Sequence, residues 1–157
     1  MPPIQRVLFV CMGNICRSPM GEALFRHHSI LQGLDDVDVD SAGVGAWHAG
    51  ESPDHRMRQT AQQFGVVVEG EARKIRKKDL LHFDLILCSD VDILEQVLAL
   101  GGDEDRTKLM LDYHPELEGQ DVPDPYYGGA DGFKDVFHML DEACRSLVES
   151  IASGRQS

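Results

Sequence analysis

The chain has 157 residues, a length that fits one folded domain over residues 1–157, and its 42% hydrophobic and 27% charged content is that of an ordinary globular protein. Its formal net charge of −12 disfavours binding to nucleic acid or to acidic membranes, because both need a cationic surface. We find neither a run of about 18 apolar residues, which would predict a membrane-spanning helix, nor a signal-peptide pattern, so we expect a cytoplasmic protein.

Strand-like and helix-like segments alternate along the chain. Apolar or alternating stretches predict four strands, at residues 6–11, 37–43, 83–90 and 108–112. Helical spacing and capping residues predict helices at residues 18–32, 52–65, 91–102 and 133–152, with a short helical turn at 77–83. This order predicts a parallel sheet with helices on both faces, and a functional site beyond the carboxyl ends of its strands.

One basic run, RKIRKK at residues 73–78, stands out in this acidic chain. We interpret it as a solvated turn followed by a helix start rather than as a nucleic-acid-binding patch. The overall negative charge would repel an anionic substrate. Any anion site must therefore be local, built from backbone amides and one or two arginines.

Such a site is predicted in the loop between the first strand and the first helix. Cys11 ends the strand, Arg17 follows six positions later, and Gly13 and Asn14 lie between them. A loop this short, entering a helix near Ser18, must turn its backbone N–H groups inward, and glycine and asparagine tolerate the positive φ that this needs. The amides, the helix N-terminus and the guanidinium together form an anion-binding nest. Cysteines in such electropositive settings ionise readily, so we expect a thiolate nucleophile aimed at phosphorus.

The stretch VCMGNICRSP, residues 10–19, resembles the phosphate-binding loop of the low-molecular-weight protein tyrosine phosphatases. Further segments of that family's pattern follow in order: SAG at 41–43, Trp47, SPDHR at 52–56, FDLILCSD at 83–90 and DPYYGG at 124–129. The resemblance implies a flavodoxin-like α/β fold with a four-stranded parallel sheet. It also implies a hydrolase without metal or cofactor that cleaves phosphotyrosine in proteins, and small aryl phosphates, through a cysteinyl-phosphate intermediate. Inorganic phosphate or vanadate would bind as a ligand.

The resemblance assigns roles within the loop. Cys11 would attack phosphorus, and Arg17 would hold two equatorial oxygens and stabilise the transition state. Ser18 would bond the cysteine sulfur and help it leave in the second step. Asn14 and Ser41 would be a supporting pair that fixes the loop, although they also fit a turn residue and a strand-end hydroxyl. The phosphate cradle would consist of the amides of Met12, Gly13, Asn14, Ile15, Cys16 and Arg17.

A second loop would supply the proton that a phenolate leaving group needs. Asp124, followed by Pro125, matches the family's general acid, which then becomes the base that activates water. Tyr126, Tyr127 and Trp47 resemble the aromatic walls of a deep, narrow cleft that phosphotyrosine could enter. Ile15, in the first loop, would add an apolar contact near the aryl ring.

Four cysteines are expected to be reduced thiols: Cys11, Cys16, Cys88 and Cys144. Many family members carry a second cysteine at the place of Cys16, where it can form a disulfide with the nucleophile. Such a disulfide would trap an oxidised Cys11 reversibly. An equally good interpretation is that Cys16 is a small apolar residue packed behind the loop.

Other functions remain open on the sequence. Arsenate reductase shares the Cys11–Arg17 loop, and LCSDVD at 87–92 resembles its segment with a resolving cysteine, but the following ILEQVLAL lacks the further cysteine that the reaction needs. Relatives that hydrolyse phosphoarginine tend to carry threonine at the place of Ile15. A phosphotyrosine-binding module without turnover is a third alternative. The seven histidines show no metal-ligand spacing, and the oligomeric state is not predicted.

Overall fold

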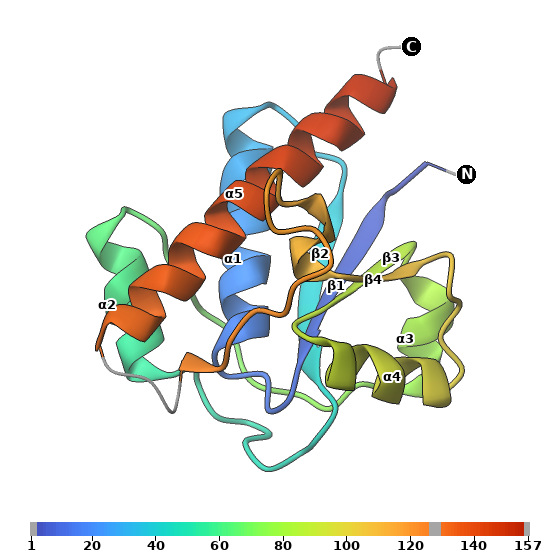
Figure 1. Cartoon of the computed structure of the whole chain (residues 1–157), viewed down its shortest axis with the longest axis horizontal. Coiled ribbons are helices and arrows are strands. Elements are labelled where there is room, and N and C mark those ends of the chain that lie inside the picture. Colours follow the sequence, from blue (N-terminus) through green and yellow to red (C-terminus); the bar gives the residue numbers. More distant parts are fainter. Residues whose placement is uncertain (1–2, 126–129, 156–157) are drawn as a thin grey trace.

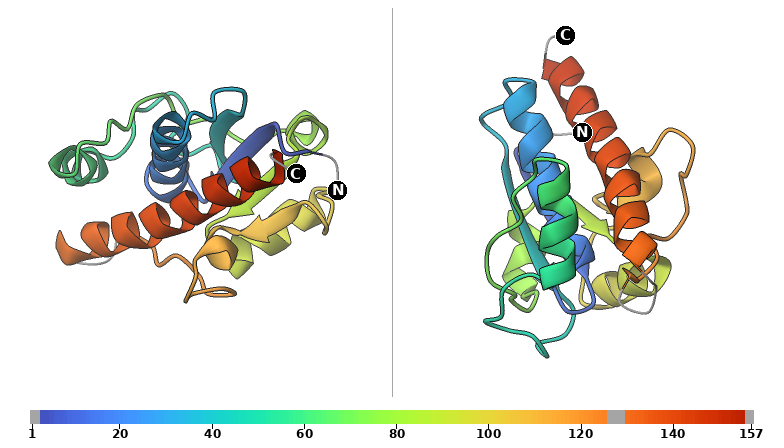
Figure 2. Two further views of the ribbon diagram at one scale, coloured as in Figure 1. Left: turned by 90° about the horizontal axis from the view of Figure 1, so that it is seen from above. Right: turned by 90° about the vertical axis from the view of Figure 1, so that its left-hand side faces the viewer.

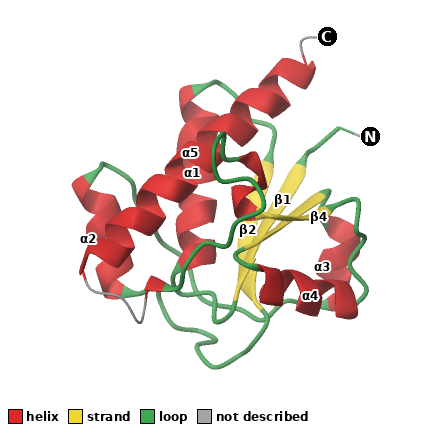
Figure 3. Ribbon diagram, in the orientation of Figure 1, coloured by secondary structure: helices red, strands yellow, loops and turns green. Residues whose placement is uncertain are grey.

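The computed structural model describes residues 3–125 and 130–155. Its centre is a four-stranded sheet in the order β2-β1-β3-β4, and every neighbouring pair of strands is parallel (Figures 1 and 3). The α/β fold with a four-stranded parallel sheet, expected from the sequence, is confirmed. The strands are β1 (Arg6–Cys11), β2 (Asp38–Gly43), β3 (Leu85–Cys88) and β4 (Thr107–Leu109).

Helices cover both faces of the sheet, and Figure 2 shows these layers from two further directions. One face carries α1 (Arg17–Leu31), α2 (His55–Gln63) and α5 (Ala130–Arg155); the other carries α3 (Lys77–His82) and α4 (Val91–Ala99). None of the helices that the structure describes is both long and apolar enough to span a membrane.

The central strand β1 is buried on both sides, as its continuous apolar run predicts. Val7 and Phe9 belong to the core beneath α1 and α5, whereas Leu8 and Val10 belong to the core beneath α3 and α4. Successive side chains of a strand point to opposite faces, so this one strand joins the two cores. It therefore holds Cys11, at its carboxyl end, in a rigid position.

Helix α1 approaches β1 closely because it carries Gly21 where it crosses Phe9. A Cβ atom at Gly21 would lie 2.4 Å from Cδ1 of Phe9, which is far inside van der Waals contact. The Phe9 ring instead packs beside Phe25, with 6.2 Å between the ring centroids. This close approach sets where the first turn of α1, and therefore Arg17, lies relative to the end of β1.

At the fourth strand the structure differs from the prediction in the type of element. It ends at Leu109 rather than at residue 112, and a 3₁₀ helix, η1 (Met110–Tyr113), replaces its second half. The Asp112 carboxylate accepts hydrogen bonds from the backbone N–H groups of Leu109 and Gly119, at 3.0 Å each. These local bonds compete with the sheet and turn the chain away from it.

Candidate active site

The site lies at the switch point of the sheet. β1 and β3 are neighbours, but β1 leads into α1 on one face and β3 leads into α4 on the other. Their connections therefore diverge and leave a crevice at the carboxyl edge, where ligands bind in open α/β sheets. Arg17, at the end of the loop after β1, meets Asp90, after β3, at this edge.

Asn14 fixes the conformation of the loop after β1. Its φ is 60°, in the left-handed region predicted for this position. Its Nδ2 donates to Oγ of Ser18 at 2.8 Å and to Oγ of Ser41 at 2.9 Å, while its Oδ1 accepts from the backbone N–H of Arg73 at 2.9 Å. Both amide hydrogens and the carbonyl oxygen of this side chain are thus bonded. Burying this polar side chain therefore costs little free energy, and its bonds hold the loop rigid.

Cys11 lies beneath this loop and is 3% exposed. Its Sγ is 3.0 Å from Oγ of Ser18, which also accepts from Asn14. The hydroxyl hydrogen of Ser18 has two acceptors in reach, this sulfur and the backbone oxygen of Ala42 at 3.4 Å. A thiolate can only accept, so with Cys11 ionised the shorter contact is a bond from Ser18 to sulfur.

Arg17, the first residue of α1, is buried, and two groups hold its guanidinium. Nη1 donates to Oδ2 of Asp90 at 2.7 Å and to the backbone oxygen of Val122 at 3.0 Å. Asp90 also caps α4 by accepting from the N–H of Ile93 at 2.9 Å. The sequence did not predict Asp90 as the partner of Arg17, although an acid directly after a buried strand at the predicted site edge is a usable signal.

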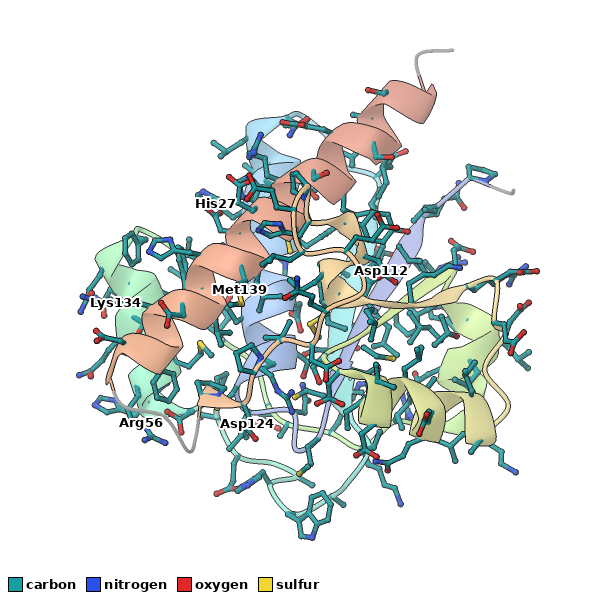
Figure 4. All side chains as sticks on the ribbon, in the orientation of Figure 1. His27, Arg56, Asp112, Asp124, Lys134 and Met139 are labelled. Atoms are coloured by element: carbon teal, nitrogen blue, oxygen red, sulfur yellow. The ribbon has the colours of Figure 1, made fainter. Side chains whose placement is uncertain are left out.

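A pocket of about 290 Å³ opens above Cys11. Figure 4 labels Asp124 on the segment that leads towards α5, at the carboxyl edge of the sheet. Trp47 lines the pocket but is 72% exposed, so it lies at the rim. Tyr126 and Tyr127, predicted as cleft walls, lie outside the described residues. The lining residues are Cys11, Met12, Gly13, Ile15, Cys16, Arg17, Trp47, His48 and Asp124.

The comparisons with known proteins agree with this geometry. The model of the low molecular weight phosphotyrosine protein phosphatases matches residues 6–157. A low molecular weight phosphotyrosine protein phosphatase of Schizosaccharomyces pombe is 40% identical over 151 residues (94% of this chain and 97% of that protein), and the Bacillus subtilis protein-tyrosine-phosphatase YfkJ is 38% identical over 154 (96% and 97%). The crystal structure of a protein tyrosine phosphatase from Entamoeba histolytica superposes with a TM-score of 0.90 at 34% identity, covering 96% of this chain and 99% of that one.

The chain belongs to the low molecular weight phosphotyrosine protein phosphatase family. It is a protein-tyrosine-phosphatase, a hydrolase that uses the family's cysteine-based mechanism. The comparisons give no better support to arsenate reduction or to phosphoarginine hydrolysis.

His48 is a pocket residue of this phosphatase that the sequence analysis missed. Its Nδ1 lies 2.5 Å from Oε2 of Glu51, and a Cβ atom at Gly13 would lie 2.9 Å from its Cδ2. Glycine at position 13 therefore lets the imidazole lie directly against the loop that follows β1. The only feature of the sequence that could have identified His48 as a pocket residue is its position next to Trp47. A single histidine in a loop has no distinctive spacing to other residues.

Cys16 shares the pocket lining with Cys11 and is buried. Burial raises the pKa of its thiol to about 12, and the negative charges of Asp54, Cys11 and Asp124 add to this rise. Cys16 is therefore a neutral thiol near pH 7. A neutral thiol is a poor nucleophile, so Cys16 does not compete with Cys11 for phosphorus.

The other two cysteines lie away from the pocket lining. Cys88 ends β3 and Cys144 lies on α5; both are buried, and burial raises the pKa of each thiol. All four cysteines are free. Among residues 3–125 and 130–155, no group of three or more histidine, cysteine, aspartate or glutamate side chains could hold a metal ion.

Proposed function

We propose that Cys11 is the nucleophile with which this phosphatase hydrolyses phosphotyrosine in protein substrates. The proposal rests on one observation: Cys11 lines a pocket together with Arg17 and Asp124, and its Sγ lies 3.0 Å from the hydroxyl of Ser18, which can stabilise a negative charge on sulfur. The thiolate attacks phosphorus, the bond from phosphorus to the phenolic oxygen breaks, and a cysteinyl-phosphate forms. Water then attacks phosphorus, the sulfur leaves as thiolate, and inorganic phosphate is released.

Arg17 and the loop amides bind the phosphoryl group in both steps. The guanidinium offers a planar fork that matches two equatorial oxygens, and the amides of residues 12–17 supply further donors. Asp90 and Val122 accept hydrogen bonds from Nη1, so the guanidinium is held in place before substrate arrives. Donors fixed in advance do not need to reorganise when charge develops in the transition state. The same cradle would bind phosphate or vanadate.

Ser18, Asn14 and Ser41 support the nucleophile. The Ser18 hydroxyl stabilises the thiolate in the resting enzyme and again when sulfur leaves phosphorus. Asn14 keeps Ser18 in place, and Ser41 anchors Asn14 to the end of β2 while donating to Oε1 of Glu22 at 2.7 Å. These contacts favour the interpretation that Asn14 and Ser41 act as a pair that supports the loop. They disfavour the alternative, in which Asn14 is only a turn residue and Ser41 only a hydroxyl at the end of a strand.

Asp124 protonates the phenolic oxygen and then takes a proton from the attacking water. Its presence in the same pocket lining as Cys11 supports this assignment, and Pro125 limits the backbone freedom of its loop. Ile15 and Trp47 in the lining supply apolar surface for an aryl ring. Tyr126 and Tyr127 are proposed, from the sequence, as further walls.

Cys16 protects the nucleophile from irreversible oxidation. Both thiols line one pocket, so a sulfenic acid on Cys11 can condense with Cys16, releasing water and leaving a disulfide that thiol reductants reverse. A nucleophile that must stay reduced suits the cytoplasm, where glutathione and thioredoxin keep thiols free. We therefore place the enzyme there.

The assignment of Cys11 is tested with Cys11→Ser. The variant should lose at least about 10³-fold in turnover of phosphotyrosine peptides, because a serine hydroxyl is not ionised at neutral pH. Phosphate and vanadate should still bind to the intact cradle, as measured by calorimetry. Cys144→Ser, which changes a buried thiol away from the pocket, is the matched control. Turnover near that of the wild type in Cys11→Ser would assign the nucleophile to another residue.

A further inference from the structure

Four cations lie close together where the chain enters α3, and they are not used by the site described above. Arg73, the first residue of the basic run, is not solvated as expected: it pairs with Asp40 at 3.1 Å and with Asp79 at 2.9 Å. The helix start at Lys77 agrees with the expectation. The remaining cations of the run form what we call the basic edge: Lys74, Arg76, Lys77 and Lys78.

The basic edge is unusual because most of its charge is unpaired in a chain with a net charge of −12. Within the described part of the chain, Lys74, Lys77 and Lys78 have no carboxylate partner, and Arg76 has only a long contact of 3.9 Å with Asp79. Several cations elsewhere, such as Arg26, Arg56 and Arg145, pair with nearby acids at 3.3 Å or less. The other cations without a carboxylate partner are spread singly along the described chain: Arg6, Arg58, Lys108 and Lys134. Unpaired positive charge is thus concentrated on one edge of an acidic protein, where it can attract an acidic partner.

The basic edge begins close to the nucleophile. Cys11 pairs with Gly43 across β1 and β2, and Gly43 in turn bridges to Lys74 in parallel. Neighbouring strands are about 4.8 Å apart, so the backbone of Lys74 lies roughly 10 Å from that of Cys11. An extended peptide covers this distance in about three residues.

The segment before the basic edge is also bound to the pocket rim. Ala72 donates its N–H to the backbone oxygen of Glu51 at 2.8 Å and accepts from Gly50 at 2.9 Å. Figure 1 shows this stretch, between α2 and α3, passing the loop that follows β2 at the carboxyl edge of the sheet. A peptide leaving the pocket on this side would therefore run from the rim onto the basic edge.

The surface at the basic edge has room for such a peptide. A hollow of about 470 Å³ is lined by Arg76, Lys78, Asp79, Leu81 and His82, and Leu81 is 88% exposed. Asp79 is buried and bonded to Arg73, so the charges that the hollow exposes are the positive ones of Arg76 and Lys78. The cationic side chains of Arg76 and Lys78 beside the exposed Leu81 suit carboxylate side chains interspersed with apolar ones. A nucleic acid carries a charge on every nucleotide and would extend from the basic edge over the strongly acidic remainder of the protein, whereas a few carboxylates can stay on the basic edge.

We propose that the basic edge binds acidic side chains located about three or more residues from the phosphotyrosine of the protein substrate. The inference rests on the proposed function, since it takes the pocket above Cys11 as the place of the phosphotyrosine. It assigns to this phosphatase a preference for phosphotyrosines in acidic sequence. The attraction is between exposed charges, so it falls as ionic strength rises.

The test compares two variants that lose the same charge. One is Lys74→Gln/Lys77→Gln/Lys78→Gln; the control, Arg106→Gln/Lys108→Gln/Arg145→Gln, removes three cations around β4 and on α5. The substrates are a phosphotyrosine peptide flanked on both sides by glutamates, the same peptide with glutamines, and p-nitrophenyl phosphate. At low salt, the first variant should lose about tenfold in kcat/KM for the glutamate peptide only, and added salt should shrink the difference.

Two results would overturn the inference while leaving the proposed function intact: equal losses in both variants, or no loss in either, with p-nitrophenyl phosphate hydrolysed normally throughout. Binding of a single-stranded oligonucleotide to the basic edge, without any effect of the variants on peptide turnover, would likewise overturn it. Failure of the wild-type enzyme to hydrolyse any of the three substrates would instead overturn the proposed function itself.

Discussion

If Asp124 is the general acid, as we propose, its contribution to the rate should depend on the leaving group of the substrate. Asp124→Asn keeps the shape of the side chain but cannot give up a proton, so it should slow cleavage of phosphotyrosine, whose phenolate is a poor leaving group, by about 10²–10⁴-fold. The loss should be much smaller for a nitrophenyl ester, which departs without a proton. The measurement is the single-turnover cleavage rate of several aryl phosphates plotted against leaving-group pKa.

Asp121→Asn is the matched control for Asp124→Asn, because Asp121 lies three residues earlier and its carboxylate accepts from the N–H of Val91 at 3.0 Å. That variant should follow the dependence of the wild type. If Asp124→Asn also gave the slope of the wild type, Asp124 would not be the acid, and Asp90 or Asp121 would have to be considered.

Cys16 should determine whether oxidation of the enzyme is reversible. Mild peroxide should inactivate both the wild type and Cys16→Ser, because both keep the reactive Cys11. Thiol reductant should restore most activity to the wild type and little to the variant, whose Cys11 proceeds to sulfinic acid. Peptide mapping should find the Cys11–Cys16 disulfide in the oxidised wild type. Equal recovery in both proteins would leave Cys16 as a packing residue only.

At the scale of elements, α3 is held to the rest of the fold by Asp79. This buried carboxylate accepts from Nη1 of Arg73 at 2.9 Å and from the N–H of Arg76 at 2.7 Å. Burial raises the pKa of Asp79, but these hydrogen bonds outweigh it and hold the pKa below its usual value. Arg73 in turn donates its backbone N–H to Oδ1 of Asn14, so the same cluster supports the loop between β1 and α1.

Asp79→Asn should therefore lower the free energy of unfolding at pH 7 by about 2–4 kcal/mol. A carboxylate with a lowered pKa in the folded state stabilises at pH values above its unfolded pKa of about 3.9 and loses this effect as pH falls through the folded value. The difference between wild type and variant should thus be constant from pH 7 to 5 and shrink below about pH 4, as measured by urea unfolding.

The exposed pair of Glu142 and Arg145 provides the control for Asp79→Asn. Glu142→Gln breaks a 2.9 Å contact between two half-exposed side chains and should cost less than about 1 kcal/mol. An Asp79→Asn effect that persisted unchanged down to pH 3 would show that charge is not the cause.

The sequence predicted the elements whose signal is local. β1 and α1 were located to within one residue, because a continuous apolar run and a helical period identify them directly. The end of β4 was not located as closely, because hydrogen bonds to the Asp112 side chain replace those of the sheet there. The loop from Cys11 to Arg17 could be predicted because all its chemistry lies in one stretch of sequence.

The contacts that the sequence could not give are those that depend on the strand order. Arg17 meets Asp90 only because β3 lies next to β1, and Arg73 reaches Asn14 only because its segment pairs with the end of β2. The sequence predicted a solvated Arg73, because Asp40 is far from it along the chain and no local pattern pairs the two residues. Such partners become visible only when the sheet is assembled.

At the scale of the whole molecule, an acidic protein binds an anion by keeping its positive charge local. The net charge of −12 repels phosphate at long range. The fold offsets this by bringing the first turn of α1, the loop amides and Arg17 to one end of the sheet, where they act over a few ångströms. The central claim is that this arrangement serves a covalent step on Cys11.

Trapping the intermediate tests that claim most directly. The wild-type enzyme is mixed with an activated aryl phosphate, whose fast cleavage lets the intermediate accumulate, quenched within milliseconds, digested and sequenced by mass spectrometry. We predict one phosphoryl group on the peptide spanning residues 7–17, with fragment ions that place it on Cys11 rather than Cys16. A phosphoryl group on any other residue, or a burst of phenol release without a phosphoryl-enzyme, would contradict the account.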